Sequence, residues 1–331
     1  MSSKSPSLKF PDASHIAKVL LYFRTGGKKI LLSIFLSSVY TFAFDYNLKP
    51  VKVTNDVWCF LGKLDMPTKE NGGFMSNSCY VKADKSYVLI DSGASYGFAS
   101  QAYEAMSKIE KLPVSTVIST HSHDDHWLGN SFYKEKFNAK ILGPSLINKE
   151  YNENTITRMH QVLSKEDFKG TKIIPVDDVV NETRTLKIGN KEITIIPTGV
   201  KAHTSEDLFV FIPSEKILFS GDVIMNGRVT SNRDGSVIGT LKAIDMIKEK
   251  DWNYLVAGHG LDTSKTAIND TVEYFSLLKQ RVLEAIENDT SGTEITKVVT
   301  MDEFKDKPLY GELNSKNVYD AFRELEFYEE D

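Results

Sequence analysis

One six-residue motif of histidines and aspartates constrains this chain more than any other feature of its sequence. The motif, His121-Ser-His-Asp-Asp-His126, places three imidazoles beside carboxylates. Residues 112–120, which precede it, are rich in β-branched side chains and predict a buried strand. The motif therefore lies where a strand ends and a loop begins, on a rigid support. Imidazole nitrogen and carboxylate oxygen both bind divalent ions such as zinc, so the motif predicts a metal site.

The spacing within the motif favours two metal ions over one. His121 and His123 are two residues apart, so in an extended segment both reach one ion from the same side. Asp125 and His126 follow the turn and are placed to bind a second ion. Further candidate ligands follow strand-like segments later in the chain: His203, Asp222 and His259. Only seven histidines occur in 331 residues, and their concentration in these motifs argues against unrelated core or surface histidines.

The order of these motifs resembles the metallo-β-lactamase superfamily: HxHxDH, then His, then Gly-Asp, then Gly-His-Gly, between about residues 53 and 261. The resemblance implies an α+β fold, the αββα sandwich, with the metal ligands at one edge. It also implies two ligand sets that share a bridging carboxylate: His121, His123 and His203; Asp125, His126 and His259; and Asp222 between them. Leu89-Ile-Asp-Ser-Gly93 matches an early strand-end motif of the family, in which Asp91 stands behind a metal ligand.

The chemistry that the resemblance implies is metal-assisted hydrolysis without a Ser or Cys nucleophile. A pair of ions lowers the pKa of a shared water, and one ion polarises a carbonyl or phosphoryl oxygen of the substrate. Asp125 is the candidate catalytic residue, because it would hold the second ion and orient the nucleophile. We expect two Zn²⁺ ions, and mixed nitrogen and oxygen ligation also accepts iron or manganese.

The substrate is less constrained than the metal site. Asp222 is typical of glyoxalase II-like thioesterases, nucleases and relay-associated hydrolases, whereas zinc β-lactamases normally have Cys or Ser at this place. Glyoxalase II has Gly-Cys-Gly-Arg after its bridging aspartate, and the segment here, Met225-Asn-Gly-Arg-Val229, matches only in part. The end of the chain, 317–326, is similar to periplasmic members associated with sulfur oxidation and quinoprotein relays. We expect hydrolysis of a small-molecule ester, thioester or amide; the alternatives are a glutathione thioesterase, a zinc β-lactamase, and a non-catalytic metal-binding accessory protein of a periplasmic redox system.

Three side chains near the motifs are candidates for contact with the substrate. Trp127 stands where the family has a glycine after the motif, so its indole would stack on a substrate or pack in the core. Arg228 and Arg233 would bind a carboxylate or phosphate through a bidentate fork, or form surface ion pairs. Glu206 replaces the glycine of the usual His-Thr-x-Gly-Asp, a change that should alter a turn and leave metal binding intact.

Residues 1–43 predict a secretory signal, or a membrane anchor if the segment is not removed. Lys28 and Lys29 precede fifteen uncharged residues, 30–44, a run that is short for a membrane span but typical of a signal sequence. Thr41 and Ala43 are small residues that fit cleavage after Ala43. We therefore expect a periplasmic or secreted protein that contacts the membrane only through this segment.

The charge of the remaining chain argues against a nucleic-acid partner. Residues 1–43 hold six Lys or Arg and one Asp, so their removal leaves 34 basic and 44 acidic residues, a net charge of −10. Nucleic-acid binding is driven by basic surfaces, and no run of Lys or Arg stands out here.

The rest of the chain divides into a catalytic domain and a helical extension. We expect the domain over residues 44–262 and the extension over 263–331, packed on it; the alternatives are that its helices cap the substrate or mediate an oligomer. The predicted helices include 99–110, 236–250, 264–287, 293–304 and 315–327, with a helical insertion over 131–170 and strands at 171–176 and 208–212. Cys59 and Cys79 lie in separate strand-like segments, either as a disulfide in an oxidising compartment or as buried thiols.

Overall fold

The computed structural model of the chain describes residues 18–25, 28–35 and 44–328. It divides into two compact units, Met1–Ala43 and Phe44–Asp331.

In the first unit, β1 (Lys18–Thr25) and β2 (Lys28–Phe35) pair as antiparallel strands. The cleavage point expected after Ala43 lies outside the described residues. Among the residues that are described, no helix is both long and apolar enough to cross a membrane.

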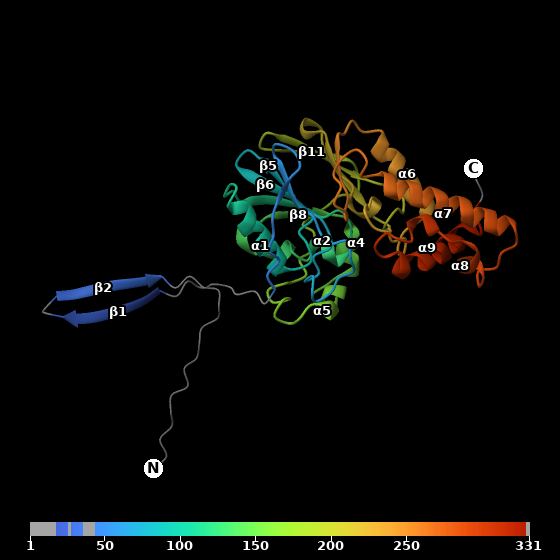
Figure 1. Cartoon of the computed structure of the whole chain (residues 1–331). Helices are drawn as coiled ribbons and strands as arrows, with labels where there is room; N and C mark the ends of the chain where they lie inside the picture. The colour runs from blue at the N-terminus through green and yellow to red at the C-terminus, as the bar shows by residue number, and fades with distance from the viewer. Residues whose placement is uncertain (1–17, 26–27, 36–43, 329–331) are drawn as a thin grey trace, which may run out of the picture. The chain divides into compact units, whose positions relative to one another are not determined.

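The second unit is built on two β-sheets (Figure 1). The larger sheet has seven strands that are neighbours in chain order: β3 (Val51–Lys52), β4 (Val57–Phe60), β5 (Ser78–Ala83), β6 (Ser86–Ile90), β7 (Val114–Ile118), β8 (Lys140–Gly143) and β9 (Asp178–Val179). The smaller sheet has five, also in chain order: β10 (Arg184–Ile188), β11 (Lys191–Pro197), β12 (Leu208–Ile212), β13 (Ile217–Phe219) and β14 (Tyr254–Val256). The run from β6 to β9 and the pair β13 and β14 are parallel, so the carboxyl ends within each group meet at one edge.

The side-chain alternation of the strands creates one apolar core between the sheets and one on each outer face. In β5, Cys79 and Val81 enter the central core, whereas Tyr80 points to the opposite face of the sheet. Ile193 and Val210 of the smaller sheet enter the same central core from the other side. The two sheets are therefore packed face to face.

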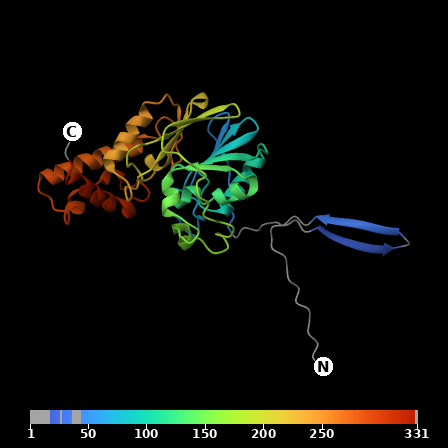
Figure 2. The same ribbon diagram turned by 180° about the vertical axis from the view of Figure 1, so that it is seen from behind.

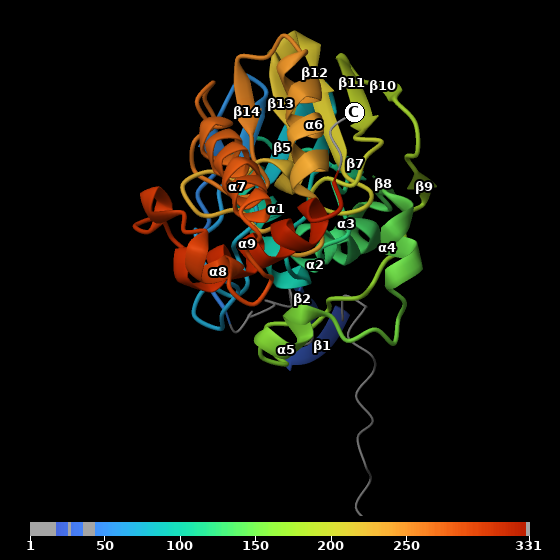
Figure 3. The same cartoon turned by 90° about the vertical axis from the view of Figure 1, so that its right-hand side faces the viewer.

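Helices cover both outer faces. Helix α1 (Tyr96–Ser107) and helix α3 (Asn130–Phe137) pack on the larger sheet, and α6 (Val237–Lys248) packs on β12 and β13 of the smaller one, as Figure 3 shows. The side chain of Ser95 caps the start of α1 by accepting a hydrogen bond from Phe98 N, and Ser236 caps α6 in the same way. The predicted αββα sandwich is confirmed.

The C-terminal extension forms a separate apolar cluster at one end of the sheets (Figure 2). Its helices are α7 (Asn269–Glu287), α8 (Ile295–Val298) and α9 (Tyr310–Leu325), with a short 3-10 helix at Asp302–Phe304. The cluster also takes in Val229 and Val237 from the preceding domain. The extension is thus joined to the domain through apolar packing.

The structure differs from the sequence-based expectation in three segments. The helix expected over 293–304 is divided into α8 and the 3-10 helix Asp302–Phe304, with residues 299–301 between them. No strand forms over 171–176, where Pro175 lacks a backbone donor and the Asn148 side chain hydrogen-bonds both backbone groups of Val176. The insertion 131–170 contains most of α3, α4 (Ser145–Glu150) and α5 (Arg158–Val162), but also strand β8. Its apolar run, Ile141 and Leu142 between Lys140 and Gly143, is too short to predict a strand.

The two cysteines form a disulfide. Cys59 of β4 and Cys79 of β5 face each other across the antiparallel pair, with their Cα atoms 4.1 Å apart. Of the two states expected for these residues, the structure has the disulfide, and its sulfur atoms lie in the central core.

Candidate metal centre

The first ligand motif lies at the carboxyl end of β7, as its position after a β-branched segment predicted. The strand ends at Ile118, and helix α2 (Asp124–Trp127) begins directly after His123. One turn of helix therefore turns Asp125 and His126 back toward the strand end. The chain reverses within six residues, and this brings all the candidate ligands of the motif to one edge of the sheet.

The other candidate ligands come from the smaller sheet. His203 lies in the loop between β11 and β12, Asp222 lies in a 3-10 helix after β13, and His259 follows β14. Gly258 makes the close approach of these segments possible, because a Cβ atom there would lie 1.9 Å from Asp222 Oδ1. Strand ends from both sheets thus meet at a single edge of the sandwich.

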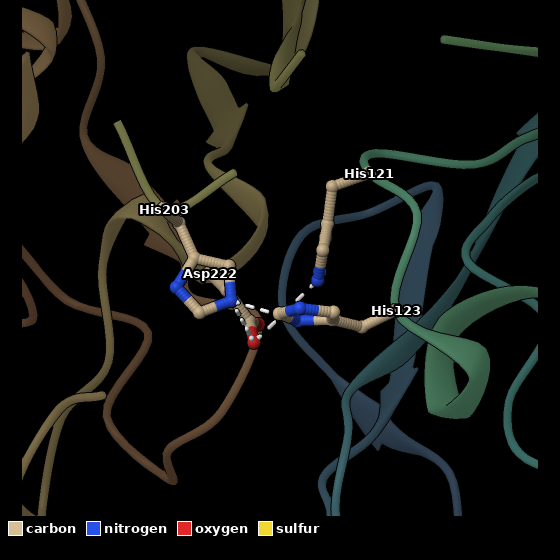
Figure 4. A group of neighbouring side chains, drawn as sticks. All are labelled: His121, His123, His203 and Asp222. Atoms are coloured by element: carbon tan, nitrogen blue, oxygen red, sulfur yellow. Dashed lines mark hydrogen bonds and ion pairs between the residues drawn. The ribbon is translucent and has the colours of Figure 1, made fainter. Parts of the chain in front are cut away.

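Four side chains form the first donor cluster: His121, His123, His203 and Asp222, whose donor atoms all lie within 4.8 Å of one another. His203 Nε2 is 2.9 Å from His123 Nδ1 and 3.3 Å from Asp222 Oδ2. His121 Nε2 is 3.7 Å from the same carboxylate oxygen. Figure 4 shows the rings turned toward the Asp222 carboxylate from two sides.

Three further side chains form the second cluster. Asp125 Oδ2 lies 3.5 Å from His126 Nε2 and 3.4 Å from His259 Nε2, and the two imidazole nitrogens are 3.4 Å apart. The Asp222 carboxylate reaches this cluster too, with Oδ1 3.2 Å from His126 Nε2 and Oδ2 3.2 Å from His259 Nε2. Asp222 therefore lies between the two clusters and contacts both.

The donor atoms fit metal ions better than they fit one another. Within the described part of the chain, His121 Nε2, Asp125 Oδ2 and Asp222 Oδ1 are buried atoms without a hydrogen-bond partner. Such atoms are rare in folded proteins, because each costs about 1–3 kcal/mol when left unpaired. One cation in each cluster would give all three of these atoms a partner.

The protonation of His121 and of Asp125 also suits metal binding. Burial lowers the pKa of the His121 imidazole well below its ordinary value, which leaves the ring neutral with a lone pair to donate. Burial alone would raise the pKa of the Asp125 carboxyl, but the Arg158 guanidinium and neighbouring imidazoles hold it well below its usual range. The anionic carboxylate and neutral imidazole are the ligand forms that divalent metals require.

Each histidine of the second cluster is oriented by a hydrogen bond to its other nitrogen. His126 Nδ1 lies 2.9 Å from Asp91 Oδ2, and His259 Nδ1 donates to Met75 O at 2.7 Å. In the first cluster, His123 Nε2 lies 3.0 Å from Asp234 Oδ2. These contacts direct the opposite nitrogen of each ring toward the donor cluster. Asp91 thus stands behind a candidate ligand, the position that the family resemblance implied.

Two functional contacts could not be found from sequence spacing. Arg158 at the start of α5 donates to the carboxylates of both Asp124 and Asp125, and so fixes the candidate catalytic residue. Glu206 accepts hydrogen bonds from Leu146 N at 2.9 Å and from Lys149 Nζ at 2.9 Å, and thereby ties the His203 loop to α4. Both contacts come from the helical insertion, whose sequence carries no periodic signal that relates it to the metal motif.

Of the two roles expected for Trp127, contact with a substrate or packing in the core, the structure has packing in the core. The indole is fully buried, packs edge-on against Tyr151 with a centroid distance of 4.9 Å, and donates from Nε1 to Ser122 O at 2.8 Å. Trp127 therefore holds the ligand loop from the core side and has no surface in the pocket.

A pocket of about 350 Å³ opens onto both donor clusters. Its charged lining, apart from the candidate ligands, is Arg158, Arg228, Arg233, Lys316 and Asp320, and its apolar lining includes Met66, Met75, Met225 and Leu313. Arg228 and Arg233, both expected near the site, thus lie in the pocket wall. Arg228 is buried, whereas Arg233 is exposed and forms an ion pair with Asp234 at 2.7 Å.

The chain is similar in sequence to a family model and to known proteins. A family model for the metallo-beta-lactamase superfamily matches residues 71–259. A metallo-beta-lactamase type 2 from Elizabethkingia meningoseptica is 27% identical over 216 residues, which cover 63% of this chain and 78% of the relative. A hydroxyacylglutathione hydrolase from Mesorhizobium japonicum is 26% identical over 108 residues, and the match covers 33% of each protein.

Solved structures share the fold at lower sequence identity. A metallo-beta-lactamase from Pontibacter korlensis matches with a TM-score of 0.55 and 20% identity, over 69% of this chain and 99% of that protein. The stereoselective inverting sec-alkylsulfatase Pisa1 from Pseudomonas sp. matches with a TM-score of 0.63 and 18% identity, over 85% of this chain but only 51% of that enzyme. Since the family model spans more than half of the chain, this protein belongs to the metallo-beta-lactamase superfamily, a family of hydrolases.

Proposed function

We propose that this protein is an exported dinuclear zinc hydrolase that cleaves a small-molecule ester, thioester or amide. The observation that carries the proposal is the position of Asp222, whose two carboxylate oxygens lie 3.2 Å from a nitrogen of His126 and of His259 and also contact the first cluster. One carboxylate shared by two donor clusters suits two ions at a catalytic site better than a single structural ion.

When bound, a pair of divalent ions supplies a water of lowered pKa and a Lewis acid for the substrate oxygen. The residues of the chain would position the ions and the attacking water. Asp125 would orient the attacking water at the second site, and Arg158 keeps the Asp125 carboxylate anionic and fixed. His121, His123 and His203 would hold the first ion at the floor of the pocket.

A glyoxalase II-like thioesterase is the second candidate. The hydroxyacylglutathione hydrolase relatives and the aspartate at position 222 support it. A β-lactamase activity is supported by the longer match to the type 2 enzyme. The thioesterase and β-lactamase activities are those of the named relatives, and both are proposed here only as alternatives for this chain.

Two features support export. The basic residues and apolar run of the N-terminal segment are typical of a secretory signal. The disulfide between Cys59 and Cys79 is a bond that persists in oxidising compartments such as the periplasm. Detection of the mature protein in the periplasmic or secreted fraction, with its N-terminus after residue 43, would test this part of the proposal.

The activity is tested by assaying the purified protein on four substrates: S-lactoylglutathione, a chromogenic cephalosporin, an aryl ester and a phosphodiester. We expect turnover of at least one, with loss of about 100-fold or more in His121→Ala and in Asp125→Ala. Full activity in metal-free protein would refute the proposal. Full metal loading without turnover of any substrate would favour the non-catalytic accessory role instead.

A further inference from the structure

Asp124 stands inside the ligand motif but belongs to neither donor cluster. Its carboxylate is buried and accepts hydrogen bonds from two groups at the start of α5, Met159 N at 2.9 Å and Arg158 Nε at 3.2 Å. A buried carboxylate needs such partners, because they replace the hydration that it has lost. Asp124 therefore holds the start of α5, and Arg158 with it, beside the ligand loop.

Arg158 occupies one oxygen of the Asp125 carboxylate and leaves the other oxygen to the second cluster. Its Nη2 donates to Asp125 Oδ1 and also lies 3.1 Å from Asp124 Oδ1. Asp125 Oδ2 has no hydrogen-bond partner in the part of the chain that the structure describes. This oxygen lies 3.5 Å from His126 Nε2 and 3.4 Å from His259 Nε2. Asp125 thus offers a metal ion one oxygen and not two.

Arg158 brings a positive charge directly to a candidate metal ligand. The guanidinium is always charged, so it shares the negative charge of Asp125 and repels a divalent cation that binds the same carboxylate. Asp124 pairs with the same guanidinium and offsets part of its charge. Within residues 44–328, the ion pairs of Arg158 involve Asp124 and Asp125 and no member of the first cluster. The charge of Arg158 therefore acts on the second cluster.

The position of Asp125 does not depend on Arg158 alone. Ser76 Oγ donates to Asp125 O at 2.6 Å, and the backbone of α2 is closed by hydrogen bonds from His126 N to His123 O at 3.1 Å and from Leu128 N to Asp124 O at 3.3 Å. A protein without the Arg158 guanidinium would therefore keep Asp125 at the second cluster, with the charge beside it changed.

We propose that Arg158 is a positioning residue for Asp125: it confines the carboxylate to one metal-facing oxygen and, through its positive charge, weakens the second cluster for its ion. The inference rests on the dinuclear site of the proposed function and names the residue that sets the affinity of the second position. Asp124 acts in the opposite direction, because it offsets the charge of Arg158.

The test uses two variants that change the charge beside the second cluster in opposite directions. Metal-free protein is titrated with Zn²⁺ against a chromogenic chelator, which gives two dissociation constants, and His259→Ala identifies the constant of the second cluster. Arg158→Met removes the positive charge and should tighten the second ion about tenfold or more. Asp124→Asn removes the offsetting negative charge and should weaken the second ion about threefold to tenfold. The first constant should stay within about threefold in both variants.

A merely structural role for Arg158 and Asp124 would give a different pattern. Loss of packing would weaken metal binding in both variants, whereas the charge effect shifts the second constant in opposite directions. Arg158→Lys keeps the charge and should leave the second constant within about threefold. Arg184→Met is the matched control, because the Arg184 side chain is as exposed as that of Arg158, 30% in each, and pairs with Asp178 at 2.9 Å, outside both clusters. It should change neither constant.

Thermal unfolding of the metal-free protein is measured for every variant. Arg158→Met leaves the buried Asp124 carboxylate without its cation, which is a destabilising change. If that variant does not fold, Asp124→Asn decides, since its amide is isosteric with the carboxylate: an unchanged or tighter second ion would overturn the proposal. In a folded Arg158→Met, a second ion bound as in the wild type or more weakly would overturn it too.

The same titration separates failure of this inference from failure of the proposed function. A wild type that binds two ions, with both variants shifted as expected, supports the role of Arg158 even if none of the four substrates is hydrolysed. Two ions and full turnover with unshifted constants overturn the role of Arg158 and leave the proposed function intact. A wild type that binds a single ion overturns the dinuclear site and this inference together.

Discussion

The Asp91 carboxylate connects the end of β6 to the metal-binding edge through the ring of His126. Asp91 Oδ2 lies 2.9 Å from His126 Nδ1 and accepts a hydrogen bond from Thr120 Oγ1, while Oδ1 accepts one from Thr120 N, both at 2.8 Å. Asp91 has a φ of 52°, in the left-handed region that few residues other than glycine adopt. This backbone conformation is unfavourable for most side chains, and at this position it places the Asp91 carboxylate behind His126.

Asp91→Asn should therefore weaken metal binding without unfolding the protein. The amide would no longer present an anionic acceptor to His126 Nδ1, and loss of such a supporting contact typically reduces metal affinity about 10- to 100-fold. Competition with a chromogenic chelator measures the affinity. Asp84→Asn is the control, because Asp84 has a similar φ of 57° but is exposed in the turn between β5 and β6. An equal loss of metal affinity in both variants would show that the backbone conformation, and not the contact with His126, causes the loss.

Asp222→Ser tests whether this carboxylate joins the two clusters. A hydroxyl cannot contact both clusters as the carboxylate does, so the metal content should fall from two ions per chain toward one. Thioester and phosphoester turnover should fall sharply, and lactam turnover, where present, should fall less. Asp245→Ser, at an exposed position of α6, should change neither quantity. Unchanged metal content and thioester turnover in Asp222→Ser would remove Asp222 from the ligand set.

Asn317→Ala should loosen the segment that carries Arg228. The amide donates to Thr230 O and to Tyr274 Oη at 3.0 Å, and it accepts from Asn232 N at 3.0 Å, all in a buried place. Removing it leaves backbone groups unpaired, which should lower the free energy of unfolding by about 1–3 kcal/mol. The KM for the ester substrates should rise while metal content stays constant. Denaturant unfolding and steady-state kinetics check this, with the exposed Ser315→Ala of the same helix as control.

The disulfide should contribute measurably to stability. It links residues 20 apart in sequence, and closing a loop of this length stabilises a fold by about 3 kcal/mol in the chain-entropy account. A reducing agent should therefore lower the free energy of unfolding of the wild type by about 2–4 kcal/mol. The same agent should have no effect on a Cys59→Ala, Cys79→Ala double variant. Equal stability of the wild type with and without reductant would contradict a stabilising bond.

The ligand positions followed from the sequence because they depend on local rules. Each candidate ligand lies in the segment that follows a strand, at three to eight residues from the end of that strand, and parallel strands present their carboxyl ends at one edge. The HxHxDH spacing then determines which side chains face each other across a single helical turn. This part of the site needs only the order of the strands.

The rest of the site depends on tertiary packing. Trp127 was ambiguous because an aromatic residue beside a metal motif serves equally as a pocket wall or as core, and only the burial by α4 and the following segment decides for core. Arg158 is 33 residues from its partner Asp125, on a helix with no strong periodicity. The Asn317 contacts span 43 to 87 residues. Contacts between residues so far apart in the sequence cannot be predicted from the spacing of residues within a motif.

The measurement that tests the account most directly is the metal content of the full chain purified from its native host. Elemental analysis should find two zinc ions per wild-type chain and a reduced content in His121→Ala and in His259→Ala, which remove one donor from each cluster. Hydrolytic activity should fall with the metal in both variants and return when zinc is restored to stripped wild-type protein. A wild-type chain that is fully active with no bound metal, or one that binds a single ion with Asp222 dispensable, would contradict the dinuclear centre.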